Sequence, residues 1–146
     1  MEKKFKEKKI QIRNPFDEVI HLYMNRKRAN LEKVGLYIGQ PVALEVLYQN
    51  PGLTQIEIAS LCGVKAPTVH VMLERLAKKG IIEKRTLEKG LKTNGIYLTE
   101  QGEKIYHLAI QAQKQTDEEK FKGFTEEERQ EFYQYLNRIK ENLKRD

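Results

Sequence analysis

Residues 53–82 read LTQIEIASLCGVKAPTVHVMLERLAKKGII, and this stretch decides the fold. Within it, Thr54 and Glu57 have the spacing of a capping box, in which each side chain satisfies a free amide at the start of a helix. The pattern predicts one helix over residues 54–61, a short turn that contains a glycine, and a second helix over residues 65–79. Two helices joined by such a tight turn form a helix-turn-helix.

Each of these two helices has an apolar face. We expect the first helix to bury Ile56, Ile58, Ala59 and Leu61. The second helix ends at Gly80, and its apolar stripe consists of Val69, Leu73, Leu76 and Ala77. Its opposite side is expected to face outward and carries Pro67, Thr68, His70, Val71, Glu74 and Arg75.

The flanking segments complete a larger motif. A short helix is predicted from near Gln40 to residues 50–52, where Asn-Pro-Gly stops it, and its inward residues are expected to be Val42, Leu44, Val46 and Leu47. Downstream, two apolar stretches at residues 81–86 and 96–99 are separated by a polar loop with a glycine, which is typical of a hairpin. A helix-turn-helix followed directly by a hairpin is a winged helix-turn-helix, and the hairpin is its wing.

Further helices are predicted at the two ends of the chain. Asn14 can cap a first helix that runs to about Asn30. Thr99 can cap a fifth helix, and Thr125 and Glu128 can open a sixth through a second capping box. The fifth helix carries Ile105, Leu108, Ala109 and Ala112. The sixth carries a long apolar stripe made of Phe132, Leu136, Ile139 and Leu143, which needs a surface to pack against.

The predicted fold class is therefore mostly α with a small β-hairpin wing: a winged helix-turn-helix with N- and C-terminal dimerisation helices. Residues 1–13 are rich in lysine and poor in apolar residues, so we expect a basic, flexible arm. Residues 14–146 are expected to form a single domain, with the winged helix-turn-helix at about 36–100. The dimerisation helices would lie at about 14–34 and 100–145.

Composition narrows the classes of function. The chain has 146 residues and a formal net charge of +6, which favours a polyanion such as DNA as partner. Its one cysteine, Cys62, cannot form an internal disulfide, and its three histidines form no cluster with metal-ligand spacing, so neither metal nor cofactor is expected. We find no nucleophile with a base and no paired carboxylates, which argues against an enzyme. No apolar run is long enough to cross a bilayer, and we expect a cytoplasmic protein.

The outward side of the 65–79 helix is the predicted DNA-contacting surface. A helix fits the major groove, and short polar groups with cations can reach base edges and phosphates there. Charges on the wing can add contacts to phosphates or to the minor groove. The predicted contact residues are Lys65, Pro67, Thr68, His70, Val71, Arg75, Arg85, Lys89 and Lys92.

Residues 35–102 resemble the MarR family of bacterial and archaeal regulators. The resemblance is carried by GLYIGQPVALEVL (35–47), by the stretch 53–82 and by IYLTEQG (96–102), in the expected order. The segment KGFTEEERQEFYQYLNRIKENL (122–143) also looks like the closing helix of that family. One departure concerns the wing, where the family's usual Asp-x-Arg is replaced by Gly90 and Lys92. Lysine keeps the charge but lacks the planar fork of arginine.

The resemblance implies a regulator that binds a palindromic operator as a homodimer and acts as a ligand-responsive repressor or, less often in such proteins, as an activator. In such a dimer the first helix and the last two helices interlock across a two-fold axis, with contacts from Phe16, Ile20, Phe132, Leu136, Ile139 and Leu143. A small-molecule effector would lie between the dimer helices and the DNA-binding lobe, near His21, Met24, Arg28 and Tyr37. The alternatives are a winged-helix module that binds protein without DNA, and a fragment or subunit of an enzyme.

Overall fold

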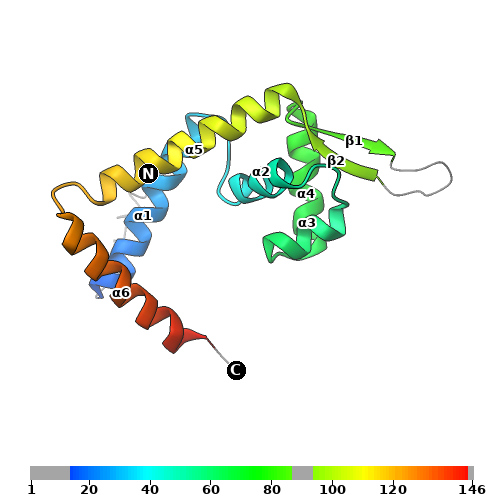
Figure 1. Cartoon of the computed structure of the whole chain (residues 1–146). Helices are drawn as coiled ribbons and strands as arrows, with labels where there is room; N and C mark the ends of the chain where they lie inside the picture. Colours follow the sequence, from blue (N-terminus) through cyan, green and yellow to red (C-terminus); the bar gives the residue numbers. More distant parts are fainter. Residues whose placement is uncertain (1–13, 87–93, 145–146) are drawn as a thin grey trace, which may run out of the picture.

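The computed structural model describes residues 14–86 and 94–144 and confirms a mostly helical winged fold (Figure 1). The elements in chain order are α1 (Pro15–Glu32), α2 (Gln40–Gln49), α3 (Gln55–Cys62), α4 (Ala66–Lys78), β1 (Ile82–Thr86), β2 (Asn94–Leu98), α5 (Glu100–Lys120) and α6 (Glu126–Leu143). The long helix α5 joins two parts of the molecule. One part is a lobe that contains α2, α3, α4 and the wing, and the other part, the arm, contains α1 and α6.

The caps expected from the sequence are formed. The side chain of Asn14 accepts a 2.9 Å hydrogen bond from the amide of Phe16 at the start of α1. Both capping boxes are complete, since Thr54 pairs with Glu57 and Thr125 with Glu128. The hydrogen bonds from Thr54 also lower the pKa of the Glu57 carboxyl, because they favour its charged form.

Helices α3 and α4 form the helix-turn-helix. Their axes are bent by 111° at the turn, within the roughly 90–120° typical of the motif. Gly63 ends α3 with a φ of 66°, a left-handed conformation that glycine adopts without a Cβ clash. Within the described ranges, no single helix is both long and apolar enough to span a membrane.

The wing is a two-stranded antiparallel sheet. Its register pairs Ile82 with Leu98 and Glu83 with Tyr97. The turn after α2 extends this sheet, because the amide of Ile96 donates to the carbonyl of Leu53 at 2.9 Å, and the amide of Gly52 donates back to the carbonyl of Ile96 at 2.9 Å. The wing is thereby joined to the start of the helix-turn-helix.

One core holds the lobe together, and it is largely apolar. Its fully buried apolar side chains come from the loop before α2 and from α2, α3, α4 and β2, and include Leu36, Leu44, Leu47, Ile58, Val69, Leu73, Leu76 and Ile96. Within α4, the stripe expected from the sequence is confirmed for Val69, Leu73 and Leu76, while Ala77 is half-buried.

Three expectations about burial were wrong, because the predicted faces were too wide. Ile56 is 76% exposed and Leu61 is 58% exposed, and Val42 also lies at the surface. The eight residues of α3 are covered on the side of Ile58, Ala59 and Cys62, since α2 and α4 pack there. Residues that turn away from this side on the helix cannot reach the core.

The arm is attached to the lobe by α5. Helix α1 packs along α5, and a buried polar pair joins them: the amide nitrogen of Asn30 donates to the hydroxyl of Thr116 at 2.9 Å, and that hydroxyl donates to the carbonyl of Ala112 at 3.0 Å. Helix α6 has no buried residue. It is attached through Phe121, whose ring meets the ring of Phe132 edge-on, with 5.7 Å between centroids.

Candidate nucleic-acid interface

The outward side of α4 is an exposed surface, and the buried residues on the opposite side of the helix determine which residues it contains. Val69, Leu73 and Leu76 anchor the helix in the core, and Met72 and Ala77 pack partly against it, so the residues on the opposite side of α4 are exposed. The α4 residues predicted to contact DNA, and Lys65 at the N-cap, are all exposed: Lys65, Pro67, Thr68, His70, Val71 and Arg75. Glu74 is half-buried instead.

The cations of this surface differ in their availability. Lys65, Arg75 and Lys78 form no ion pair with any residue in the ranges 14–86 and 94–144. Lys84 is engaged, because its ammonium pairs with Glu74, and this hydrogen bond and charge lower the pKa of the Glu74 carboxyl. A polyanion would therefore meet the three free cations without first breaking an ion pair.

His70 is connected to the preceding helix. Its Nδ1 lies 3.3 Å from Oε1 of Gln55, the first residue of α3. This contact joins the two helices of the motif on their exposed side and limits the rotamers of His70. Gln55 was missed in the sequence because the two residues are 15 positions apart and meet only through the bend between the helices.

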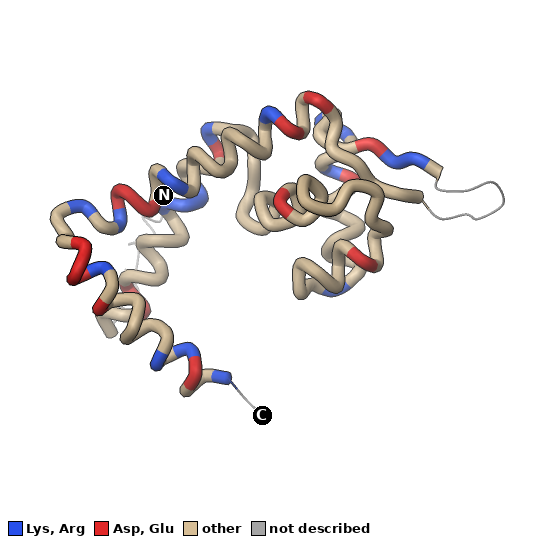
Figure 2. The backbone as a smooth tube through the Cα atoms, in the orientation of Figure 1, with Lys and Arg blue, Asp and Glu red and all other residues tan. Residues whose placement is uncertain are grey.

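The wing contributes one predicted residue that the structure describes. Arg85 lies on β1, where its guanidinium pairs with Glu83 and stacks over the ring of Tyr97 at 4.3 Å. Figure 2 shows the basic residues of β1 close to the point where the strand leads into the wing loop. Lys89 and Lys92, and Gly90, lie outside the described residues.

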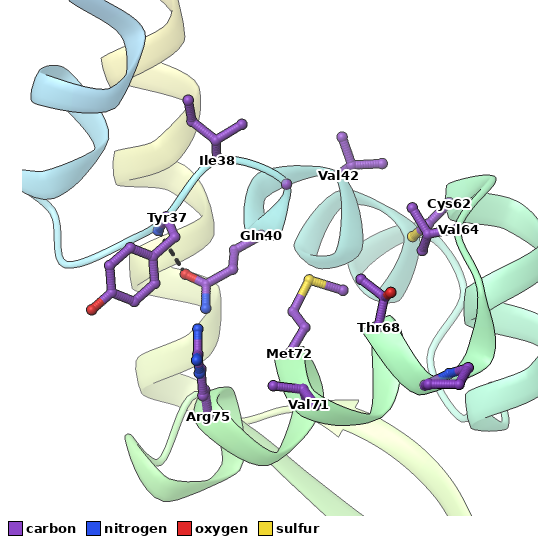
Figure 3. A pocket seen from close by; sticks show the side chains of 12 residues that line it. Tyr37, Ile38, Gln40, Val42, Cys62, Val64, Thr68, Val71, Met72 and Arg75 are labelled. Carbon is purple, nitrogen blue, oxygen red and sulfur yellow. Dashed lines mark hydrogen bonds between the residues drawn. The ribbon is translucent and has the colours of Figure 1, made fainter. Parts of the chain in front are cut away.

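A cavity of about 680 Å³ lies beside α4 (Figure 3). Its walls are mostly apolar and come from the loop before α2, from α2, from the turn after α3 and from α4. The side chain of Arg75 extends toward Gln40, whose Oε1 accepts a 2.8 Å hydrogen bond from the amide of Tyr37. Pro67, Thr68, Val71 and Arg75 belong both to this cavity and to the predicted DNA-contacting surface.

The four residues proposed for an effector do not share this cavity, since only Tyr37 lines it. His21, Met24 and Arg28 lie on α1, where Asn25 accepts a 3.1 Å hydrogen bond from Arg28 and lies 3.1 Å from the ring of His21. Cys62 also lines the cavity, and burial raises the pKa of its thiol. A thiol kept protonated in this way is a poor nucleophile.

The residues predicted for dimerisation lie on the arm. Phe16 and Ile20 are exposed on α1, and Leu143 is 70% exposed at the end of α6. Phe132, Leu136 and Ile139 are half-buried along one side of α6. The two faces are thus apolar surfaces that the single chain covers only in part.

Comparison with known proteins agrees with this geometry. Residues 43–83 match the family described as winged helix-turn-helix DNA-binding. The HTH-type transcriptional regulator YybA of Bacillus subtilis (strain 168) is 32% identical over 108 residues, which cover 74% of this chain and 72% of the relative. The crystal structure of MarR is 25% identical, with a TM-score of 0.70, and the match covers 88% of this chain and 97% of that one.

The chain belongs to the MarR family of transcriptional regulators. Another MarR-like fold is that of MepR from S. aureus in a complex with DNA, with a TM-score of 0.72 at 24% identity, covering 88% of this chain and 95% of that one. As a MarR-type protein, the chain is a DNA-binding transcriptional regulator and not an enzyme.

Proposed function

We propose that two copies of this protein bind a palindromic operator, each with α4 in a major groove, and repress transcription until a small molecule releases them. The observation that carries this proposal is the exposed side of α4, with Lys65, Arg75 and Lys78 unpaired within the described ranges. A helix anchored by buried leucines and bare on its other side has the form that major-groove recognition needs.

The residues of α4 divide by what they can reach. Thr68 and His70 are near the N-terminal end of the helix, from which side chains of this motif contact base edges. Val71 can make an apolar contact with a thymine methyl group. Lys65 and Lys78, at the two ends of the helix, are suited to phosphates, which position the protein without reading sequence.

Dimerisation is supported by apolar surface on the arm that the single chain covers only in part. Phe16 and Ile20 on α1 and the stripe on α6 expose apolar area that a single chain leaves in contact with water. Burying apolar surface contributes about 25 cal/mol per Å², so a second copy that covers both faces would stabilise the arm. A two-fold dimer presents two copies of α4, and an operator with matching half-sites is a palindrome.

Effector response is supported by the cavity beside α4. It is large enough for a small molecule, its walls are mostly apolar, and Arg75 supplies a cation at one side. An apolar compound with an acceptor or anionic group would fit this lining. Because Thr68, Val71 and Arg75 line the cavity, such a compound would engage side chains that the operator also uses.

The first test is selection of genomic DNA fragments by the purified protein, followed by sequencing. We expect a shared palindromic motif, with half-sites about one helical turn apart. Arg75→Ala should then weaken operator binding by about 1–3 kcal/mol. Lys122→Ala is the matched control, because this exposed cation lies in the turn between α5 and α6. If no duplex is enriched, the protein-interaction module becomes the better explanation.

The second test concerns the effector. Compounds from a small-molecule library would be scored for release of the selected operator. Val42→Trp adds bulk to the cavity from α2, on the side away from α4, so it should leave operator binding intact and remove the response. Release of this variant at the same concentration as the parent would place the effector elsewhere.

A further inference from the structure

Arg85, Tyr97 and Glu83 form a cluster on one face of the wing. Tyr97 is paired with Glu83 across the two strands, and Arg85, two residues after Glu83, lies on the same face. Nε of Arg85 donates to Oε1 of Glu83 at 2.8 Å, and Nη2 donates to the same oxygen. The guanidinium carbon lies 4.3 Å from the centroid of the Tyr97 ring.

Tyr97 is itself held from the other side. A Cβ built on Gly52 would lie 2.7 Å from the Tyr97 hydroxyl, so the ring end fits against the bare backbone of the turn after α2. That turn is fixed to β2 by two 2.9 Å backbone hydrogen bonds, which join Gly52 and Leu53 to Ile96. The ring therefore has a rigid support at its hydroxyl end and a cation over its face.

Arg85 remains open to a ligand despite these contacts. Its side chain is 59% exposed, and Nη1 has no hydrogen-bond partner among residues 14–86 and 94–144. A guanidinium held in one plane loses less conformational freedom when it binds an anion, and its planar fork suits a phosphate. Lys84 does not compete, because the next residue of a strand points to the opposite face, where it pairs with Glu74.

We propose that Tyr97 is a positioning residue: it holds the guanidinium of Arg85, together with Glu83, in place for one phosphate of the DNA backbone. This inference rests on the proposed function, because it assumes that the wing approaches DNA. Glu83 offsets part of the charge of Arg85, so the contact depends on the orientation of the guanidinium more than on diffuse attraction. Gly52 is also needed for this arrangement, because any side chain at that position would displace the Tyr97 ring.

The test is a double-mutant cycle of DNA affinity over a salt series. A phosphate contact does not depend on base sequence, so a generic duplex of about 30 base pairs is a valid probe beside the selected operator. Arg85→Ala should weaken binding to both duplexes and reduce the slope of log affinity against log salt by about one. Tyr97→Leu should weaken binding about two- to fivefold, the range of an exposed cation–π contact, although it removes no charge.

Two variants separate positioning from folding. Tyr97→Phe keeps the ring and should bind like the parent, and Tyr97→Leu should have no further effect on binding when Arg85 is already alanine. Thermal unfolding of each variant checks the wing. The inference is overturned if Tyr97→Leu weakens binding equally in both backgrounds, if it strengthens binding, or if Arg85→Ala keeps the parent's salt slope. A parent protein that binds neither duplex would overturn the proposed function as well.

Discussion

Nζ of Lys79 donates a 2.9 Å hydrogen bond to the carbonyl of Gly35, although the two residues are 44 positions apart. The same ammonium lies 5.0 Å from the centroid of the Tyr37 ring. Lys79 caps the C-terminal end of α4, and Gly35 and Tyr37 belong to the loop that joins α1 to α2. The helix proposed to enter the major groove is thus bound directly to the segment that leads to the arm.

Lys79→Ala should loosen this loop. Because the hydrogen bond is exposed, we expect the free energy of unfolding to fall by about 1 kcal/mol, and amide hydrogen exchange over residues 33–39 to become faster. Lys78→Ala is the matched control, since it removes the same charge from the neighbouring position, which has no ion pair in the described part of the chain. Equal exchange rates in the two variants would mean that the contact does not hold the loop.

Gly102→Ala should be strongly destabilising. A Cβ at this position, near the start of α5, would lie 2.0 Å from the carbonyl oxygen of Ile81, a backbone atom that cannot rotate aside. We expect a loss of about 3 kcal/mol in the free energy of unfolding, measured by urea denaturation. Gln101→Ala, at the exposed neighbouring position, should change it by less than about 0.5 kcal/mol. Comparable losses would contradict the close packing of α5 on the wing.

Leu136→Lys should shift the proposed dimer to a monomer. A half-buried leucine on the apolar side of α6 would be replaced by a charge that a dimer interface would have to desolvate. Sedimentation velocity reports the oligomeric state directly. Asn137→Lys introduces the same charge one residue further along, at an exposed position, and should remain dimeric. A dimeric Leu136→Lys variant would show that α6 does not form the interface.

We expect the free energy of unfolding to fall at alkaline pH because of the Tyr106 hydroxyl. It donates to Oε2 of Glu45 at 2.5 Å, and this hydrogen bond, with burial, raises the pKa of Tyr106 to about 12 from its usual value near 10. The folded state therefore keeps a proton that the unfolded state loses. The extra stability is complete below about pH 10 and declines as pH rises towards 12.

Comparison with Tyr106→Phe isolates this effect from the other titrating groups. The stability of the parent relative to the variant should fall between pH 10 and 12 in urea denaturation at each pH. A difference that stays constant over this window would mean that the Tyr106–Glu45 hydrogen bond does not govern the titration. The stacking of the Tyr48 ring on the ring at position 106, with 4.3 Å between centroids, should be kept in this variant, because only the hydroxyl is lost.

Local sequence signals predicted the secondary structure well because their causes are local. Both capping boxes are formed as their residue types require. Gly80 follows α4 with a φ of 70°, and the amide of Ile81 bonds back to the carbonyl of Leu76 at 3.0 Å, which closes the helix as expected. The order of helices and hairpin that carried the resemblance to the MarR family depends on the same signals.

Contacts between elements were not predictable in the same way. Whether Ile56 is buried depends on which sides of α3 the neighbouring helices cover, and an eight-residue helix gives too short a pattern to decide this. The stacking of Arg85 on Tyr97 depends on the register of the two strands. Alternation along β1 places Glu83 and Arg85 on one face, and this was the one available signal for that cluster.

Helix α5 runs unbroken for 21 residues from the wing to the arm, a length of about 31 Å at the usual rise of 1.5 Å per residue. In the proposed dimer, a rigid helix of this length would act as a lever. A tilt of about 10° at the arm would move the opposite end by about 5 Å, which is close to one helical turn. In the proposed two-fold dimer, tilts of both α5 helices would add. The distance between the two α4 helices would then change, while the spacing between successive major grooves stays at about 34 Å.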